Sequence, residues 1–232
     1  MTRSEAAVQP FRLVVFDLDG TLVDSQGVIT EAMGLAFAGE GLEPPVAGSV
    51  RRVVGLHLDE AIARLLGDRG KESLIAPLAQ RYREAFFDLR TRPDHLEPLF
   101  PGAREALARL NQPDVLLAIA TGKNRRGLLA CLDHHEIGHE FAILKTADDG
   151  PGKPNPGILV DAMAEAGVEP HETVMIGDTT FDMTMAAGAA VRAVGVTWGY
   201  HEPEELEASG AGALARSFDE MPAVLQSLGG EA

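Results

Sequence analysis

Short apolar runs recur along the chain, and segments with helical spacing separate them. The run from Leu13 to Phe16 is continuous, contains two valines and is bounded by polar residues. This pattern is typical of a strand buried on both faces of a parallel sheet. Similar runs begin at Val115, Phe141, Thr173 and Val191. The sequence therefore predicts strands at these five places.

The segments between the later runs have apolar residues at helical intervals. They cover residues 101–111, 124–135 and 156–168, and the last of them has Gly167 near its end, as a helix C-terminus often does. Strands that alternate with helices form right-handed βαβ units, with helices on both faces of a parallel sheet. We therefore expect an α/β fold with a Rossmann-like three-layer core.

Residues 21–98 break this alternation. They contain three apolar helical patterns but no convincing strand. The simplest account is an all-helical domain inserted after the first strand. We predict that residues 1–20 and 99–232 form the core and that residues 21–98 form the insertion.

Composition and charge narrow the class of protein. The 232 residues are 45% hydrophobic and 24% charged, which is ordinary for a globular protein, and the formal net charge is -15. Such a charge disfavours binding to nucleic acids and to anionic membranes. Cys131 is the single cysteine, so no intramolecular disulfide can form, and we expect a buried, inert thiol. The chain shows neither a secretion signal nor a membrane-spanning run, so a cytoplasmic protein is expected, whereas its oligomeric state cannot be predicted.

Polar residues follow the predicted strands at their carboxyl ends. Asp17 and Asp19 come directly after the first strand and alternate onto the same face, so two like charges lie close together. Such a pair needs a proton or a cation. Thr121-Gly122 and Asp178 follow two other strands, and Lys153 lies in a loop rich in proline and glycine after a third. Since ligands of open parallel sheets bind at the carboxyl ends of the strands, we expect these residues to converge.

Four motifs carry a resemblance to a known family. In chain order they are DLDGTLVDS, IATGK, GKPNP and IGDTTFD. The chain resembles the haloacid dehalogenase-like hydrolase superfamily, in its group with a helical cap domain, and most closely its phosphoglycolate phosphatase-like members. The resemblance covers nearly the whole chain and identifies the insertion as a cap.

The resemblance implies a reaction mechanism. Asp17 would attack phosphorus and form an aspartyl-phosphate. Asp19 would protonate the leaving oxygen and later activate water, with a pKa raised by its neighbour Asp17. Mg²⁺, or equally Mn²⁺, would be held by the Asp17 carboxylate, the Asp19 backbone carbonyl, Asp178 and waters. Asp182 would support this metal site, preferably without ligating the ion.

The same resemblance assigns the groups that bind phosphate. Thr121 would donate its hydroxyl to a phosphate oxygen, and the Gly122 backbone would approach closely because it has no side chain. Lys153 would neutralise charge on Asp17 and on the transferred phosphoryl group. In the cap, Arg51 or Arg52 would reach the other end of an anionic substrate, and His57 is a further candidate for substrate contact.

Other features have structural explanations. Lys123, Arg125 and Arg126 are candidates for phosphate binding, but a basic helical turn that faces solvent is the favoured explanation. Ser25 or Asp24 fits a helix N-cap. The segment HEIGH, residues 135–139, matches a zinc-protease pattern, but its glycine and its place at a helix end argue against a zinc site.

The favoured function is therefore a Mg²⁺-dependent phosphatase acting on a small phosphorylated metabolite, with a phosphoglycolate-like substrate as the first hypothesis. The carboxyl group of Asp19 argues against dehalogenase chemistry. A phosphosugar mutase of the same fold is the alternative, although related mutases usually have valine at the place of Thr21. A non-catalytic module that binds phosphate is a third, weaker possibility.

Overall fold

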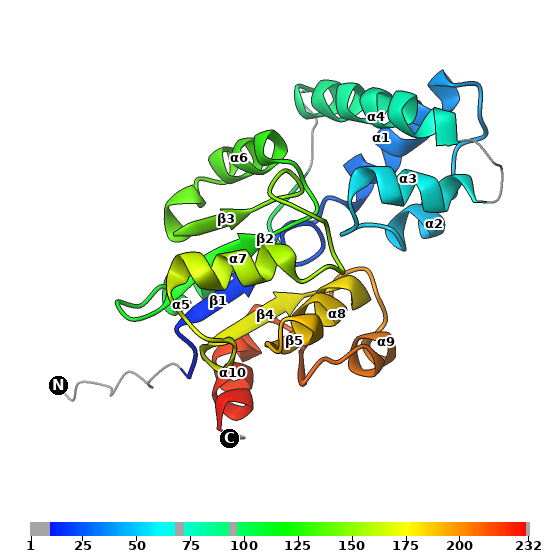
Figure 1. The fold of residues 1–232 in the computed structure, drawn as a ribbon. Helices are drawn as coiled ribbons and strands as arrows, with labels where there is room; N and C mark the ends of the chain where they lie inside the picture. Colours follow the sequence, from blue (N-terminus) through cyan, green and yellow to red (C-terminus); the bar gives the residue numbers. More distant parts are fainter. Residues whose placement is uncertain (1–9, 68–71, 93–96, 231–232) are drawn as a thin grey trace.

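The core of the protein is a parallel β-sheet covered by helices on both faces (Figure 1). The computed structural model describes residues 10–67, 72–92 and 97–230. Within these residues the sheet has six strands, all parallel, in the order β3-β2-β1-β4-β5-β6. The strands are β1 (Leu13–Phe16), β2 (Leu116–Ala120), β3 (Ile143–Lys145), β4 (Thr173–Gly177), β5 (Arg192–Val196) and β6 (Ala213–Ala215). The five predicted strands and the α/β class are confirmed, and β6 was not predicted.

Alternating side chains of each strand serve two separate hydrophobic cores. In β1, Val14 and Phe16 pack on the side of α5, α6 and α10, whereas Leu13 and Val15 pack on the side of α7, α8 and α9. All four side chains are fully buried, as expected for a central strand of a covered parallel sheet. The helices are α5 (Ala103–Leu110), α6 (Arg125–His134), α7 (Gly157–Ala166), α8 (Thr180–Gly188), α9 (Pro203–Ala208) and α10 (Met221–Gly229).

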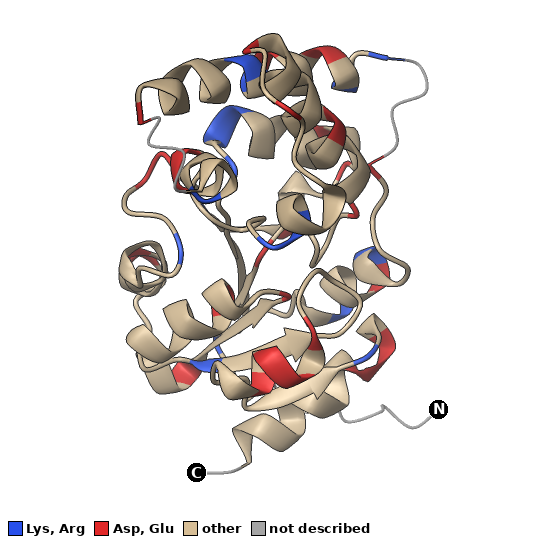
Figure 2. Cartoon of the chain, turned by 90° about the vertical axis from the view of Figure 1, so that its right-hand side faces the viewer, with Lys and Arg blue, Asp and Glu red and all other residues tan. Residues whose placement is uncertain are grey.

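A second lobe consists of helices only and lies beyond the carboxyl ends of the strands (Figures 1 and 2). We call it the helical lobe. Its helices are α1 (Gln26–Gly39), α2 (Ala47–Arg51), α3 (Leu58–Leu66) and α4 (Ile75–Arg90). They share a hydrophobic cluster of their own, which includes Met33, Phe37, Ile62 and Leu78. The exact division of the chain into core and cap, at residues 20/21 and 98/99, stays a prediction.

The helical lobe is attached to the core by polar and apolar contacts. The Arg51 guanidinium donates hydrogen bonds to the backbone carbonyls of Gly199 (2.7 Å) and Tyr200 (2.8 Å). Arg52 forms a bidentate ion pair with Glu205, with one N···O distance of 2.7 Å. Val53, Leu56 and Ala61 form a small cluster with Phe181 of α8. These contacts place the lobe directly above the strand ends.

Two of the structural expectations are confirmed. His135 caps the end of α6, and residues Gly138–Glu140 form a separate short 3₁₀ helix, so the two histidines of HEIGH do not share one helix. Cys131 is fully buried, and burial raises the pKa of its thiol to about 12. No helix in the described part of the chain has both the length and the apolar character needed to cross a bilayer.

The turn after β1 brings the backbone of Gly20 against Asp178, which follows β4. Gly20 has a positive φ of +92°, which favours glycine. A Cβ atom at this position would lie 2.2 Å from the Asp178 carboxylate oxygen Oδ2. The turn can therefore approach this carboxylate only because residue 20 has no side chain.

This packing gives a matched pair of stability predictions. We expect Gly20→Ala to lower the melting temperature about 4–8 °C more than Gly41→Ala, because the first variant must also displace Asp178, at a cost of about 2 kcal/mol. Gly41 also has a positive φ, of +70°, but no described atom lies within 4 Å of its would-be Cβ. Both variants thus carry the strain of alanine at positive φ, about 1–2 kcal/mol. Thermal unfolding of the two purified variants tests this, and equal melting temperatures would show that the close approach costs nothing.

Candidate active site

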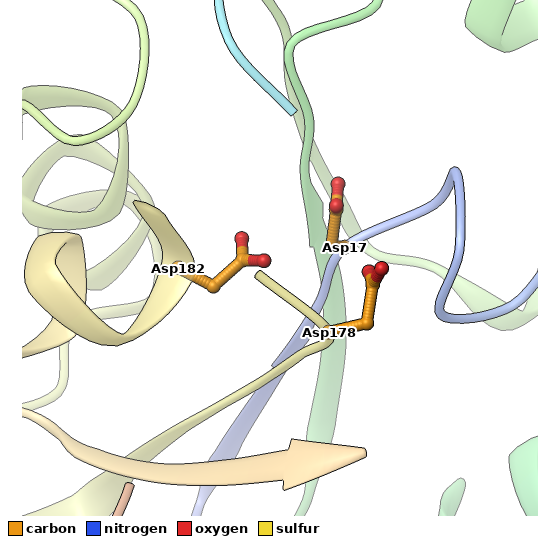
Figure 3. A group of neighbouring side chains, drawn as sticks. All are labelled: Asp17, Asp178 and Asp182. Atoms are coloured by element: carbon orange, nitrogen blue, oxygen red, sulfur yellow. The ribbon is translucent and has the colours of Figure 1, made fainter. Parts of the chain in front are cut away.

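Three buried aspartates converge at the carboxyl end of the sheet (Figure 3). Asp17 directly follows β1, Asp178 directly follows β4, and Asp182 lies in the first turn of α8. Carboxylate oxygens from the three side chains lie within 4.8 Å of one another. The expected convergence at the strand ends is therefore present, and it follows from the pairing of β1 with β4 in register.

A single lysine is inserted between two of these carboxylates. The Nζ atom of Lys153 lies 2.7 Å from Asp17 Oδ1 and 2.6 Å from Asp182 Oδ1. The Lys153 side chain is fully buried. Burial works to lower its pKa, but the two carboxylates outweigh it and raise the pKa above the ordinary value for lysine. Lys153 is therefore a fixed cation whose position depends on Asp17 and Asp182 together.

Asp17 has one engaged oxygen and one unengaged oxygen. Its Oδ2 atom is buried and has no hydrogen-bond partner among the described residues. Burial raises the pKa of Asp17 to about 7; Lys153 opposes this shift, whereas the neighbouring Asp182 adds to it. An unpartnered buried carboxylate oxygen is costly, so this atom is in the state expected for a ligand or a nucleophile.

Asp178 is held rigidly by the segments on either side of it. The Thr21 hydroxyl donates to Asp178 Oδ1 at 2.8 Å, and the Tyr200 backbone N–H donates to Oδ2 at 2.9 Å. A Cβ on Gly199 would lie 2.2 Å from Asp178 Cβ, so this segment also packs closely against the side chain. Burial, followed by repulsion from Asp17 and Asp182, raises the pKa of Asp178 well above its ordinary value.

Both oxygens of Asp182 are engaged by the protein itself. Oδ2 accepts hydrogen bonds from the Thr179 hydroxyl (2.6 Å) and backbone N–H (3.0 Å), which forms a capping box at the start of α8. Oδ1 contacts Lys153. This arrangement fits a residue that orients the site more than one that ligates a metal.

The donor set fits a hard divalent cation. Three carboxylates and one ammonium leave a net charge of -2 when all are ionised, and burial makes such an excess unfavourable. Carboxylate oxygens are the preferred ligands of Mg²⁺ and Mn²⁺. The Asp17 carboxylate and Asp178 are the groups best placed to hold the ion: each Asp178 oxygen accepts one hydrogen bond from a neutral donor and keeps a second lone pair, whereas Asp182 Oδ1 faces the ammonium of Lys153.

Asp19 lies apart from the three-carboxylate cluster and has its own partners. Its Oδ1 accepts hydrogen bonds from the Ser25 hydroxyl and from Lys123 Nζ, each at 2.7 Å, and its Oδ2 lies 2.9 Å from the same Nζ. Ser25 occupies the N-cap position of α1 but makes no capping hydrogen bond with its side chain. The predicted N-cap position of Ser25 is therefore confirmed, but its hydroxyl orients Asp19 and does not cap the helix.

Lys123 pairs with Asp19, a contact that the sequence did not indicate. The prediction that it faces solvent is wrong: its side chain is only 9% exposed and is paired with Asp19 and, at 3.6 Å, with Glu97. Burial works to lower its pKa, but these two carboxylates raise it above the ordinary value. The available signal was its position two residues after Thr121, at a strand end. Arg125 and Arg126 agree better with the prediction, since Arg126 is exposed and the Arg125 side chain is 42% exposed.

Thr121 and Gly122 lie at the end of β2, beside the aspartates. The Thr121 hydroxyl oxygen accepts a hydrogen bond from the Lys123 backbone N–H at 3.2 Å, which leaves its proton available for a ligand. A Cβ on Gly122 would lie 2.6 Å from the Gly55 carbonyl oxygen. Because residue 122 has no side chain, the backbone of the helical lobe can pack against it. This close packing is a second reason for glycine here, beside the predicted close approach of phosphate.

A cavity of about 720 Å³ lies between the core and the helical lobe. On the core side, its lining includes Asp17, Asp19, Thr121, Gly122 and Lys123. The unengaged oxygen of Asp17 therefore belongs to a side chain that a ligand in this cavity can contact.

The cap residues proposed to bind substrate have different positions. Arg51 and Arg52 attach the lobe to the core through Gly199, Tyr200 and Glu205, and neither lines the cavity. His57 lines the cavity, and its Nδ1 accepts a hydrogen bond from the Asp59 backbone N–H at 3.4 Å. Contact of Arg51, Arg52 or His57 with substrate stays a prediction.

Comparison with known proteins identifies relatives over most of the chain. The chain is 32% identical over 217 residues to the protein named Probable phosphatase IndB of Dickeya dadantii, which covers 93% of this chain and 94% of that protein. It is 33% identical over 199 residues to a phosphoglycolate phosphatase of Pseudomonas putida, covering 85% of this chain and 73% of that one.

Solved structures and a family model agree with these relatives. A haloacid dehalogenase-like family hydrolase from Streptococcus pneumoniae superposes with a TM-score of 0.80 at 27% identity, covering 92% of this chain and 98% of that one. A hydrolase from Pseudomonas syringae gives a TM-score of 0.79 at 26% identity, covering 92% and 95%. The model of the family described as haloacid dehalogenase-like hydrolase matches residues 14–196, which include the three clustered aspartates, Asp19, Thr121 and Lys153. The chain therefore belongs to the haloacid dehalogenase-like hydrolase family.

Proposed function

We propose that this protein is a Mg²⁺-dependent phosphatase that hydrolyses a small phosphate monoester through an aspartyl-phosphate on Asp17. The observation that carries the proposal is the state of the Asp17 carboxylate. Its Oδ1 is fixed by Lys153, its Oδ2 has no partner among the described residues, and the side chain lines the cavity. The phosphatase names of relatives at 32–33% identity support the same reaction class.

In the first step, Asp17 Oδ2 attacks phosphorus and the bond between phosphorus and the ester oxygen breaks. Asp19, protonated at this stage, gives its proton to the leaving alkoxide oxygen, and the alcohol departs. Ser25 and Lys123 hold the Asp19 carboxyl at a fixed place beside the cavity. The Thr121 hydroxyl donates to a phosphoryl oxygen.

In the second step, water attacks the phosphorus of the aspartyl-phosphate. Asp19 accepts the proton of this water, the bond from phosphorus to Asp17 breaks, and inorganic phosphate leaves with Asp17 regenerated. Lys153 stays against Asp17 and Asp182 throughout, so positive charge is available without reorganisation. Over the two steps Asp19 gives up one proton and regains one, and Asp17 gains and loses the phosphoryl group, so both residues return to their starting states.

The Asp17 carboxylate, Asp178 and the Asp19 backbone carbonyl are the groups proposed to hold Mg²⁺ or Mn²⁺, with Asp182 orienting Lys153 beside them. When bound, the ion neutralises charge, so that a carboxylate and a phosphate can approach each other. Phosphoglycolate, which the names of several relatives contain, is the reference substrate for the first assay. Assay of free phosphate against isomerised sugar phosphate separates hydrolysis from the mutase alternative.

Replacement of the nucleophile gives the first test of the mechanism. We expect Asp17→Asn to reduce phosphate release by at least about 10³-fold, because an amide oxygen cannot form the covalent intermediate. Asp24→Asn is the matched control, since Asp24 is exposed and lies outside the site. Release of inorganic phosphate with Mg²⁺ measures both variants. Substantial turnover by a folded Asp17→Asn protein would refute the covalent mechanism.

Metal binding can be measured without turnover. At Mg²⁺ concentrations about 100 times the dissociation constant, we expect about 2.7 kcal/mol of added stability and a rise of several degrees in melting temperature. Asp178→Asn should abolish most of this rise, because it removes a charged oxygen from the cluster. Asp24→Asn should retain it. A Mg²⁺-dependent rise of equal size in Asp178→Asn would remove Asp178 from the metal site.

The position of Lys123 predicts a role in turnover. We expect Lys123→Gln to lower kcat by about tenfold or more, because the Asp19 carboxyl loses one of its two side-chain partners. Lys145→Gln is the control, since Lys145 pairs instead with Glu165 and lies on β3, two strands away from β1 in the sheet. Steady-state kinetics of the two variants decide, and equal kcat values would mean that Lys123 has only a structural role.

A further inference from the structure

The wall of the cavity on the side of the helical lobe is mostly apolar. Residues of α1, of α4 and of the segment after α2 line it, and they include Ile29, Met33, Val54, Tyr82 and Phe86. Ile29, Met33 and Val54 are 2–8% exposed and belong to the hydrophobic cluster of the lobe. The same side chains thus pack the lobe internally and face the space that contains Asp17 and Asp19.

Aromatic rings form the part of this wall beside Lys123. The rings of Tyr82 and Phe86 are in contact, with centroids 5.7 Å apart. The Nζ atom of Lys123 lies over the Phe86 ring, 4.9 Å from its centroid. Phe86 is therefore adjacent to the ammonium that fixes Asp19, and a leaving group that departs toward the lobe would meet this ring.

The cations of the cavity are mostly neutralised by carboxylates. Lys123 is paired with Asp19 and Glu97, and Arg90 lies 3.3 Å from Glu97. Arg83 lies 3.9 Å from Asp59.

Arg126 lies on the core helix α6, is exposed, and stacks over Phe87 at 5.0 Å. Arg83, whose 3.9 Å contact with Asp59 joins two half-exposed side chains, and Arg126 are thus the described cations of the cavity without a close carboxylate, and both are exposed to solvent. The buried part of the lobe wall therefore offers no free cation, among the described residues, to a second anionic group of a substrate.

The size of the cavity also indicates a leaving group larger than two carbons. A volume of about 720 Å³ falls in the range of sites that enclose drug-sized ligands, and a two-carbon leaving group would leave most of it unfilled. Apolar surface that remains in contact with water is unfavourable, whereas a ring placed against it contributes binding free energy.

Resting on the proposed function, we infer that the substrate is a phosphate monoester whose leaving group is an uncharged, largely apolar body of about ring size, seated against Met33, Val54 and Phe86. A short carboxylated leaving group, as in phosphoglycolate, lacks the bulk to fill the cavity, and it would find no free cation among the described buried side chains of the lobe wall. The lobe thereby selects by burial of apolar surface, while the core provides the chemistry.

The test compares three esters: ethyl phosphate, 2-phenylethyl phosphate and phosphoglycolate. The leaving groups of the first two esters are primary alcohols of similar intrinsic reactivity. The difference between their kcat/KM values therefore reports on binding of the ring. With Mg²⁺ and wild-type protein, we expect kcat/KM for 2-phenylethyl phosphate to exceed both others by about tenfold or more. Equal or higher kcat/KM for phosphoglycolate, with turnover intact, would overturn the inference and leave the phosphatase proposal standing.

Two variants of the helical lobe test whether its apolar wall causes the preference for the ring. We expect Phe86→Ala to lower the ratio of kcat/KM between 2-phenylethyl and ethyl phosphate by about fivefold or more, whereas Leu35→Ala should leave the ratio unchanged. Leu35 is on the same lobe, 47% exposed, and outside the cavity. An unchanged ratio in folded Phe86→Ala would overturn the assignment to this wall. If no ester, including 4-nitrophenyl phosphate, releases phosphate, the proposed function fails and the inference with it.

Discussion

Burial of several carboxylates around one ammonium is the constraint on which the site depends. Asp17, Asp178 and Asp182 are almost wholly removed from solvent, and Lys153 is the cation that contacts two of them. Removing ionised groups from water is expensive unless they are paired, and one positive charge cannot compensate three negative ones. Burial, with repulsion between the carboxylates added to it, raises the pKa values of Asp17 and Asp178. The imbalance is what makes the site suitable for a divalent cation and an anionic substrate.

The backbone around the carboxylates is shaped by residues that lack side chains. Gly20 and Gly199 lie against Asp178, and a Cβ on Gly177 would lie 2.4 Å from Asp182 Cγ. These glycines let three chain segments meet where parallel strands end, so that the acid groups are immobilised by packing as well as by hydrogen bonds. Preorganisation of this kind lowers the reorganisation needed during phosphoryl transfer.

Local patterns predicted most of the fold, and long-range contacts explain what they missed. The central strands were predictable because both of their faces are buried, which requires unbroken apolar runs. Strand β6 is the three-residue segment Ala213–Ala215, whose two alanines give no such run, whereas β3, the edge strand on the other side, begins within a continuous apolar run that starts at Phe141. Asp17, Asp178 and Lys153 could be placed because parallel topology brings strand ends together. Lys123 could not, because its burial depends on Asp19, 104 residues away, and on the return of the chain through Glu97.

The contacts of Arg51 within the protein could not be predicted for the same reason, and they show how the two lobes are connected. Which groups Arg51 contacts depends on how the lobe packs on the core, and helical periodicity does not determine this packing. Its guanidinium is bound to the carbonyls of Gly199 and Tyr200, and the Tyr200 N–H is bound to Asp178. The lobe is thus attached to the same short segment that orients a carboxylate of the proposed metal site. One segment makes both contacts. The position of the lobe wall that faces the substrate and the position of Asp178 therefore depend on each other, and neither lobe alone defines the site.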